Sequence, residues 1–535
     1  MTAVVHPRLK PNALDDREYQ ANIAKVAIDR NTLAILPTGL GKTAIALRVI
    51  AEQLRRYPDR SILFMAPTRP LVVQHARSVA ASILGPPPLT LTGAVTPERR
   101  AALVHPPQIV VATPQVIAND LLGREFSLEG FSTIVFDEAH RAVGDYPYVT
   151  VGLANREGPR ARVLALTASP GSRKERIEAV WYNLDIEHFE YRTEDSPDVR
   201  PYIHDIGVET VTVPVPVEMR HLAILLKAAV ARQMEVLRHY DLLPPGETSR
   251  RTLLTVGERL HRQLSVDRSR GTAAAPGLWA TVTAQAAAMK GQHAVELAES
   301  QGVDALRAFF ERQDRPERGR ITPAQRAFLQ DPDVLEVRRR IERTTLEHPK
   351  IAAAVAIVAE ELRQRPNGRA IIFTQYRDTV DRLLLEFERL GSPGVRAGRF
   401  VGQATRTDDP GLSQKDQVAL LDRFRAGEIN VLVATSVAEE GLDIPATDLV
   451  VFYEPLPDVI RTIQRRGRTG RARAGRAVVL VAEGTRDEGM NRGAASRERR
   501  MHSMLEEIEA KARVGGILPP PPVHTVQRLM TEFEP

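Results

Sequence analysis

The chain has 535 residues, of which 43% are hydrophobic and 26% are charged. A chain of this length is too long for a single hydrophobic core, so we expect two to four domains. The sequence contains no cysteine, which excludes disulfides, thiolate zinc sites and iron–sulfur clusters. No apolar run is long enough to predict a membrane span, and the N-terminus lacks the apolar core of a signal peptide, so we expect a cytoplasmic protein. The formal net charge of +6 is compatible with a polyanionic partner but is weak support for one.

The first informative segment is "NTLAILPTGLGKTAIAL", an apolar strand followed by a turn with two glycines and by a helix-like run. Such a corner gathers backbone N–H groups at the positive end of the helix dipole, which suits a phosphate group. In this setting Lys42 can reach the outer phosphates of a nucleotide, and Thr43 can offer a hydroxyl group to Mg²⁺. Leu36 stands where the first glycine of a P-loop is usual. The alternative is therefore a glycine turn that happens to precede Lys-Thr.

Two further predicted strands end in polar groups. "FSTIVFDEAHRAV" places Asp137 and Glu138 at the end of an apolar run, where one carboxylate can hold Mg²⁺ and the other can polarise an attacking water. "ARVLALTASPG" places the hydroxyl groups of Thr167 and Ser169 where they could link nucleotide hydrolysis to a second ligand. Taken alone, a turn capped by Ser and Thr explains this last segment equally well.

From about residue 210 to residue 346 the strand signals stop, and apolar residues recur at the three- and four-residue spacing of helices. This pattern predicts an all-helical domain inserted between two α/β halves.

The second half repeats the strand-then-helix pattern in "GRAIIFTQYRDTV" and "INVLVATSVAEEGLDIP", which predicts another parallel α/β domain without a second P-loop. Further on, "TIQRRGRTGRARAG" gathers arginines around glycines. One interpretation is a basic patch that binds nucleic-acid phosphates. The other is that Arg468 and Arg471 reach the γ-phosphate across a cleft, where such an arginine finger is worth roughly 10³ to 10⁵ in rate.

The order of these motifs resembles that of superfamily 2 helicases: "REYQ", "LPTGLGKT", "APTRPLVVQH", "ATPQ", "DEAH", "TAS", "IIFTQYRDT", "ATSVAEEGLDIP" and "QRRGRTGR". Finer signatures, among them "HRAVGDYPYV", "GRFVGQA" and "YEPLPDVIRTIQRRGRTGR", resemble archaeal Hef, whose relatives are the Fanconi anaemia group M and Mph translocases. The resemblance covers nearly the whole chain. It implies the α/β class, with two RecA-like parallel-sheet lobes that flank an all-helical insertion domain. Inserts of this kind in Hef and in RIG-I-like proteins imply that the insertion lies over a bound duplex or fork and selects branched substrates. A helical spacer that only positions the two lobes is the alternative.

The expected domains follow from this resemblance. They are an N-terminal RecA-like ATP-binding lobe (1–209), a helical insertion domain (210–346), a C-terminal RecA-like lobe (347–490), and a C-terminal helix with a proline-containing tail (491–535).

The resemblance also implies roles for individual residues in the use of ATP and Mg²⁺. It implies adenine recognition by Gln20, phosphate binding by Thr38, Gly39, Gly41, Lys42 and Thr43, metal binding by Thr43 and Asp137, and water activation by Glu138. It further implies ribose contact by Asp443, coupling by Thr167 and Ser169, and arginine fingers at Arg468 and Arg471 in a motif that Gln464 opens. The residues implied to contact a nucleic-acid strand are Arg69, Thr92, Gly93, Thr113, Thr374, Gln375 and Thr435.

The expected activity is that of an ATP-dependent DNA helicase or translocase acting on forked or branched DNA in replication-fork repair. Two alternatives remain open at the level of sequence. One is an RNA-directed ATPase of the RIG-I-like type, since these proteins share the architecture and the insert. The other is a nucleotide-regulated scaffold that binds forks without unwinding them.

The end of the chain raises a separate question. Archaeal Hef usually continues into an XPF-type nuclease, whereas this chain stops after "LPPPPVHTVQRLMTEFEP". We expect a nuclease-free translocase rather than a truncated chain. In this tail Gln527, Met530 and Phe533 have the spacing of a sliding-clamp-binding motif, although Glu534 stands where a second aromatic residue is usual. A solvated, disordered tail is the alternative.

Overall fold

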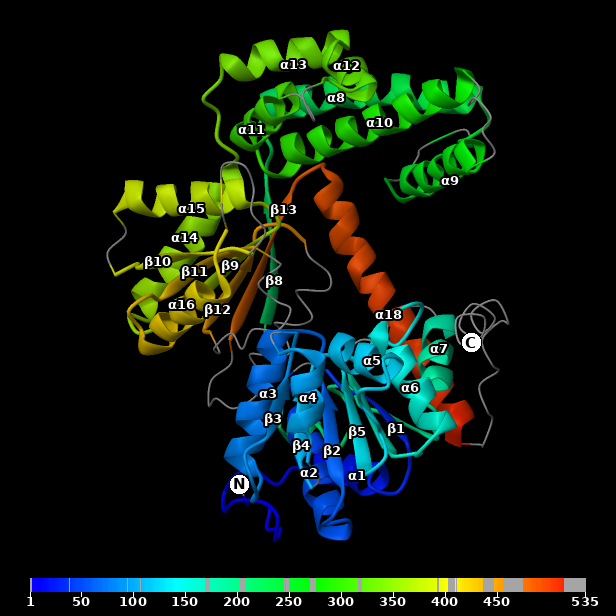
Figure 1. Cartoon of the computed structure of the whole chain (residues 1–535). Coiled ribbons are helices and arrows are strands. Elements are labelled where there is room, and N and C mark those ends of the chain that lie inside the picture. Colours follow the sequence, from blue (N-terminus) through cyan, green and yellow to red (C-terminus); the bar gives the residue numbers. More distant parts are fainter. Residues whose placement is uncertain are drawn as a thin grey trace.

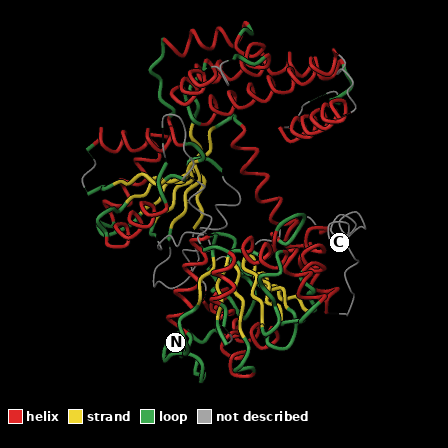
Figure 2. The backbone as a smooth tube through the Cα atoms, in the orientation of Figure 1, coloured by secondary structure: helices red, strands yellow, loops and turns green. Residues whose placement is uncertain are grey.

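The computed structural model shows two lobes, an inserted helical domain and a long C-terminal helix (Figure 1). The structure describes residues 2–37, 39–93, 95–105, 107–168, 174–202, 207–244, 246, 250–269, 276–315, 320–391, 394–402, 409, 411–435, 447–455 and 475–513. Figure 2 shows the strands gathered in two sheets, one in each lobe. The expected α/β fold with two parallel-sheet lobes is confirmed. Within the described ranges, none of the helices combines the length and the apolar character that a bilayer crossing requires.

The first lobe is built on seven parallel strands in the order β3-β4-β2-β5-β6-β1-β7. The strands are β1 (Thr32–Ile35), β2 (Ser61–Met65), β3 (Leu89–Leu91), β4 (Ile109–Ala112), β5 (Phe131–Asp137), β6 (Arg162–Thr167) and β7 (His188–Tyr191). The helices are α1 (Glu18–Ala27), α2 (Lys42–Arg56), α3 (Arg69–Ser82), α4 (Pro97–Leu103), α5 (Pro114–Leu122), α6 (Pro147–Glu157) and α7 (Lys174–Asn183), with short 3₁₀ turns η1 (Ala139–Arg141) and η2 (Arg200–Tyr202). Leu33 and Ala34 of β1 belong to different hydrophobic clusters, because alternate side chains of a strand face opposite sides of the sheet. The central strands are continuous apolar runs since both faces are covered.

The second lobe contains six parallel strands in the order β10-β11-β9-β12-β13-β8. The strands are β8 (Gly207–Val213), β9 (Ala370–Thr374), β10 (Ala397–Phe400), β11 (Val431–Thr435), β12 (Leu449–Phe452) and β13 (Arg476–Ala482), and the helices are α14 (Pro349–Gln364), α15 (Arg377–Leu390) and α16 (Gln414–Ala426). β8 precedes the insertion in sequence, yet it pairs with β13 along its whole length. The expected boundary between residues 209 and 210 therefore falls inside a strand of the second lobe. Sequence pattern did not reveal this because the partner of an edge strand is a long-range property.

The inserted domain is helical throughout its described residues. Its helices are α8 (Val217–His239), α9 (Arg250–Ser269), α10 (Pro276–Ser300), α11 (Val303–Asp314), α12 (Pro323–Leu329) and α13 (Pro332–Glu342). α8 and α10 pack along each other, and two hydrophobic clusters fill the space between the helices. This region is the helical insertion that the spacing of apolar residues predicts.

Helix α18 (Arg486–Arg513) links the second lobe to the first (Figure 1). It begins just after β13, five residues before the expected start at 491. Farther along, Met501, Leu505 and Ile508 are buried in the hydrophobic cluster of the first lobe. The hydroxyl of Tyr191 in β7 lies 2.5 Å from Nδ1 of His502. One helix is thus anchored in both lobes.

A buried ion pair fixes the start of α18. Nζ of Lys350 in α14 forms an ion pair with the carboxylate of Asp487 in α18, and both side chains are almost fully buried. The hydroxyl of Ser300, at the end of α10, donates to Oδ1 of Asp487 over 2.8 Å. Losing one partner of such a pair would leave an uncompensated buried charge, which costs several kcal/mol. The second lobe, the insertion and α18 therefore meet at one polar contact.

Glu454, two residues beyond the end of β12, is a second buried carboxyl group in this lobe. The hydroxyl of Thr374 donates to Oε1 of Glu454 over 3.3 Å, and the backbone N–H of Gln375 donates to the same oxygen. Oε2 is buried and has no hydrogen-bond partner among the described groups. Burial raises the pKa of Glu454 to about 7, against the opposing effect of the Lys350 charge.

This raised pKa predicts a pH-dependent loss of stability. The unfolded chain ionises Glu454 near pH 4.5, whereas the folded chain resists ionisation until about pH 7. The contribution of Glu454 is therefore fully present below pH 4.5 and is lost as the pH rises to about 7, by an amount on the order of 3 kcal/mol. Glu454→Gln cannot ionise and keeps an acceptor for Gln375. We expect the free energy of unfolding of this variant to fall less between pH 5 and pH 8 than that of the unaltered protein. Denaturant titrations at the two pH values measure the difference, and parallel pH profiles would contradict the assignment.

Candidate functional site

Three loops that follow neighbouring strands meet at the carboxyl edge of the first sheet. β6 lies between β5 and β1, and the last residues of these strands are in register, with Thr167 beside Ile35 and Leu166 beside Asp137. Because all three strands are parallel, their following loops leave the sheet at the same edge. Several of the residues that the sequence assigns to one site are thus brought together.

The loop between β1 and α2 has the geometry of a phosphate cradle. Gly39 and Gly41 have φ angles of +90° and +72°, and Gly41 is the N-cap of α2, whose first residue is Lys42. A Cβ atom on Gly41 would lie 2.5 Å from Nε2 of Gln20. Glycine is needed here for both the left-handed backbone and the close approach. The helix start turns unpaired N–H groups toward the site, which favours a phosphate anion.

Tyr19 and Gln20, both on α1, hold this loop in place through hydrogen bonds. Nε2 of Gln20 donates to the carbonyl oxygen of Leu40 over 3.1 Å, and the hydroxyl of Tyr19 donates to the same oxygen over 2.7 Å. Both α1 side chains are buried. In this structure the amide nitrogen of Gln20, expected to recognise adenine, is bonded to the loop itself. Tyr19 also holds the loop, through its hydrogen bond to Leu40, and the sequence did not predict this role.

Asp137 is the last residue of β5 and is almost completely buried. Its Oδ1 accepts a hydrogen bond from the backbone N–H of Glu138 over 3.0 Å, and its Oδ2 lies 2.8 Å from Nε2 of His75 in α3. The ring of His75 stacks on Phe64, with 4.4 Å between the ring centroids. The orientation of this carboxylate is therefore fixed by a buried histidine that is itself held by packing.

Glu138 follows in a left-handed conformation, with a φ of +52°. Such a backbone is uncommon outside glycine and occurs often at functional sites. Its Oε2 lies 3.3 Å from Nδ1 of His140 in η1, and the same nitrogen lies 3.0 Å from the hydroxyl oxygen of Thr167. Burial acts to raise the pKa of Glu138, but the hydrogen bond with His140 and the charge of Lys42 outweigh it and lower the pKa to about 2. Glu138 is therefore a carboxylate at neutral pH, and His140 joins it to Thr167.

The donors at this edge suit a magnesium ion that binds together with a nucleotide. The described residues contain no group of three or more His, Asp or Glu side chains that would hold a metal unaided. Mg²⁺ usually takes one or two protein ligands and completes its shell with phosphate oxygens and water. One buried carboxylate, on Asp137, beside a helix start that carries the hydroxyl of Thr43 fits that preference.

Some predicted site residues belong to segments that the structure does not describe. Thr38, Ser169, Asp443, Gln464, Arg468 and Arg471 lie outside the described residues, as do Gln527, Met530 and Phe533 of the proposed clamp motif. Their roles stay predictions.

The strand-contact residues expected in the first lobe gather at one surface hollow. Arg69, Gly93 and Thr113 line a cavity of about 610 Å³, and Thr92 immediately precedes Gly93. A Cβ atom on Gly93 would lie 3.3 Å from Nη2 of Arg69, so glycine leaves room for the guanidinium group. The arrangement combines a cation with small and hydroxyl-bearing residues, which suits a phosphodiester backbone.

A buried ion pair under this hollow was not predicted. Nε of Arg100 in α4 donates to Oδ2 of Asp120 in α5 over 2.6 Å, and both side chains are buried. Another guanidinium nitrogen of Arg100 donates to the carbonyl oxygen of Val95. Arg100 therefore ties the segment after Gly93 to α5.

In the second lobe, the residues expected to contact a nucleic-acid strand are more deeply buried than such a contact would require. Thr374 is fully buried with its hydroxyl bonded to Glu454, and Thr435 is almost fully buried. Both are the last residues of interior strands, against which α15 packs. The backbone N–H of Gln375 is also bonded to Glu454. In this structure the two threonine side chains face the protein interior.

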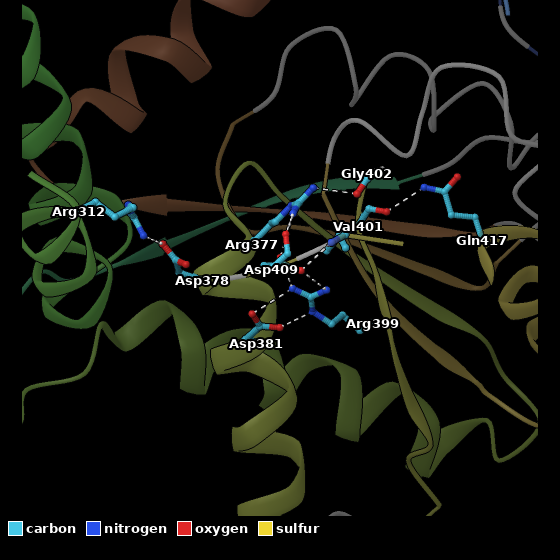
Figure 3. Close-up of polar contacts among 10 residues, drawn as sticks. Arg312, Arg377, Asp378, Asp381, Arg399, Val401, Gly402, Asp409 and Gln417 are labelled. Carbon is cyan, nitrogen blue, oxygen red and sulfur yellow. Dashed lines mark hydrogen bonds and ion pairs between the residues drawn. The ribbon is translucent and has the colours of Figure 1, made fainter. Parts of the chain in front are cut away.

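Next to these residues, an ion-pair network joins α15, β10 and Asp409 (Figure 3). Nη1 of Arg377 lies 3.0 Å from Oδ2 of Asp409, and its Nη2 donates to the carbonyl oxygen of Gly402 over 2.8 Å. Arg399 reaches the same Oδ2 over 2.7 Å and also pairs with Asp381 over 2.5 Å. The hydrogen bond from Arg399 holds the pKa of Asp409 well below its usual range. The network fixes the end of the β10 segment to the start of α15.

Sequence reasoning missed several residues that hold the site. His140 stands inside the quoted "DEAH" string, so its position was a usable signal. Tyr19 and His75 likewise stand inside the quoted strings "REYQ" and "APTRPLVVQH", although nothing local shows what they contact. Arg100 gave no signal, because its role depends on a contact with Asp120.

Two family models match the chain. The model described as "DEAD/DEAH box helicase" matches residues 17–177, and the model described as "Helicase conserved C-terminal domain" matches residues 353–473. The first match contains the phosphate loop and the acid pair, and the second covers most of the second sheet.

Similar proteins support the same assignment. A putative ATP-dependent RNA helicase of Methanocaldococcus jannaschii is 36% identical over 94% of this chain, and the ATP-dependent DNA helicase mph1 of Neurospora crassa is 33% identical over 89%. The chain spans 62% and 42% of the length of these two relatives. The crystal structure of the Hef helicase domain of Pyrococcus furiosus matches with a TM-score of 0.68 and 40% identity, covering 91% of this chain and 99% of that one. The chain therefore belongs to the Hef helicase family.

Proposed function

We propose that the chain is an ATP-dependent DNA helicase or translocase that remodels forked or branched DNA during replication-fork repair. The observation that carries the proposal is the joint placement of Lys42, Asp137 and Glu138 beside the phosphate loop, with Glu138 linked through His140 to Thr167. The name of the Neurospora crassa relative, an ATP-dependent DNA helicase, supports DNA as the substrate.

In this proposal the phosphates of ATP rest on the N–H groups of the loop from Gly39 to Thr43, and Lys42 neutralises charge on the outer phosphates. Thr43 and Asp137 would hold Mg²⁺, which would neutralise charge that develops during phosphoryl transfer. Glu138 orients the attacking water by accepting its hydrogen bond. His75 keeps the Asp137 carboxylate in place through the 2.8 Å contact.

Coupling between hydrolysis and movement rests on the contacts of His140. Its Nδ1 is within reach of both Glu138 and Thr167, so a change at the γ-phosphate can be passed to the segment after β6. We further propose that Arg468 and Arg471 sense the γ-phosphate from the second lobe, and that Asp443 and Gln464 complete that wall. Repeated closure and opening of the lobes would then advance the protein along one strand.

The proposed path of the strand in the first lobe runs over the hollow lined by Arg69, Gly93 and Thr113. The insertion is proposed to rest on the branched part of the substrate. Its position is fixed relative to the second lobe, since Gln301 in the segment after α10 accepts a hydrogen bond from Thr379 in α15 over 2.6 Å.

The second candidate is an RNA-directed ATPase, which the name of the Methanocaldococcus jannaschii relative, a putative ATP-dependent RNA helicase, favours. The two substrates differ in the 2′-hydroxyl group and in helix geometry.

Lys42→Ala tests the motor itself. Removal of the ammonium group takes away charge stabilisation at the outer phosphates, and we expect ATP hydrolysis to fall by about 10²-fold or more with loss of strand separation. Lys25→Ala, an exposed lysine on α1, is the matched control. A Lys42→Ala protein that separated forked strands with ATP as well as the unaltered protein would overturn the motor proposal.

His140→Ala tests the coupling. The variant keeps the phosphate loop, so we expect nearly unchanged ATP affinity, while stimulation of ATP hydrolysis by DNA falls about tenfold because Glu138 and Thr167 lose their shared partner. The control is His105→Ala, since His105 is exposed. Equal stimulation in the His140→Ala and unaltered proteins would refute the role of His140.

The substrate class is tested by ATP hydrolysis in the presence of forked DNA or double-stranded RNA of matched length. We expect forked DNA to stimulate the rate at least several-fold more than the RNA does. Stronger stimulation by the RNA would favour the second candidate. The slope of the response against salt concentration reports how many phosphates the protein contacts.

A further inference from the structure

A polar cavity of about 210 Å³ lies in the first lobe, away from the candidate site. Ser132 and Arg162 line it, and they stand near the amino ends of β5 and β6, whereas Asp137 and Thr167 stand at the carboxyl ends of the same strands. From Arg162 to Thr167 the strand rises roughly 17 Å. The cavity is therefore at the opposite edge of the sheet from the phosphate loop.

Four arginines line this cavity: Arg56, Arg60, Arg160 and Arg162. Arg56 pairs with Glu52 and Asp29, and Arg162 pairs with Glu187. Within the described part of the chain, neither Arg60 nor Arg160 has a carboxylate partner. The cavity thus has an excess of positive charge, since the single acidic residue in its lining is Asp29. Like charges in one cavity repel each other, and an anionic ligand would offset that cost.

The cavity also contains a hydrogen-bond acceptor, the carboxylate of Asp29. Its Oδ1 pairs with Nη1 of Arg56 over 2.5 Å, and more than half of the Asp29 side chain is exposed. An anion that carries an O–H group can donate a hydrogen bond to this carboxylate, whereas an anion without a donor meets only charge repulsion there.

Arginine donors together with an acceptor fit an oxyanion that carries its own O–H group. Hydrogen phosphate has such a group near neutral pH, whereas sulfate, the phosphodiesters of DNA and the dianions of phosphate monoesters do not. We propose that this cavity binds inorganic phosphate, at a site separate from the nucleotide site.

Calorimetric titration of the full-length Lys42→Ala protein with inorganic phosphate tests this proposal, because the substitution weakens phosphate binding at the nucleotide loop. Sulfate is the comparison ligand, with similar size and charge but no donor at pH 7. We expect phosphate to bind at least about five-fold more tightly than sulfate, since only hydrogen phosphate can donate a hydrogen bond to Asp29. Absence of phosphate binding, or equal affinity for the two anions, would overturn the proposal.

Two substitutions locate the site. Arg160 has a φ of +53°, so Arg160→Gly removes the side chain without straining the backbone. We expect Arg160→Gly and Arg60→Ala each to weaken phosphate binding about five-fold or more. Arg124→Gly is the matched control, because Arg124 has a φ of +59° and does not line the cavity. Equal loss of affinity in the control would overturn the assignment.

Measuring the affinity for duplex DNA distinguishes a free phosphate ion from a phosphate of the DNA backbone as the ligand of the cavity. We expect Arg160→Gly to leave the affinity for duplex DNA within about two-fold. Weaker DNA binding with unchanged phosphate binding would assign the cavity to the DNA backbone and overturn the small-ligand proposal. No step of this test depends on ATP hydrolysis, so its failure leaves the proposed motor function unaffected.

Discussion

The constraint on which the site depends is the parallel direction of the strands in the first sheet. Parallel strands bring all their carboxyl ends to one edge, so loops that begin as far apart in the chain as Ile35 and Thr167 become neighbours. β1 delivers the phosphate loop, β5 delivers Asp137 and Glu138, and β6 delivers Thr167. Two histidines then fix the orientation of these side chains: His75 orients Asp137, and His140 joins Glu138 to Thr167.

A second constraint governs how the parts can move. The insertion and the second lobe share contacts at Asp487, at Thr379 and at the ion pair between Arg312 and Asp378, so they are expected to move as one body. Helix α18 starts at this body and ends in the core of the first lobe. Any change in the distance between the lobes must therefore bend α18 or shift its contacts with the first lobe.

The sequence contained enough information for the two-lobed α/β fold and for the phosphate loop, because apolar strand runs and glycine turns are local patterns. The helical insertion could likewise be predicted, because its apolar residues recur every three or four residues. The position of β8 in the second sheet could not be predicted, since its partner β13 lies far along the chain. Nor could sequence pattern show that Thr374 and Thr435 are buried, or that Tyr19, His75 and Arg100 hold functional segments, because each depends on a long-range contact.

The central claim is that nucleotide at the first lobe controls the position of the second, and a distance measurement between the lobes tests it directly. The chain has no cysteine, so spin labels can be placed on Leu122→Cys in α5 and Leu390→Cys in α15, both exposed positions. The labels are placed in Glu138→Gln protein, which is expected to bind ATP without hydrolysing it. With forked DNA bound, ATP is predicted to shift the distribution of distances between the two labels. No shift is predicted when Lys42→Ala is added. An unchanged distribution on ATP binding in the Glu138→Gln protein would contradict the account.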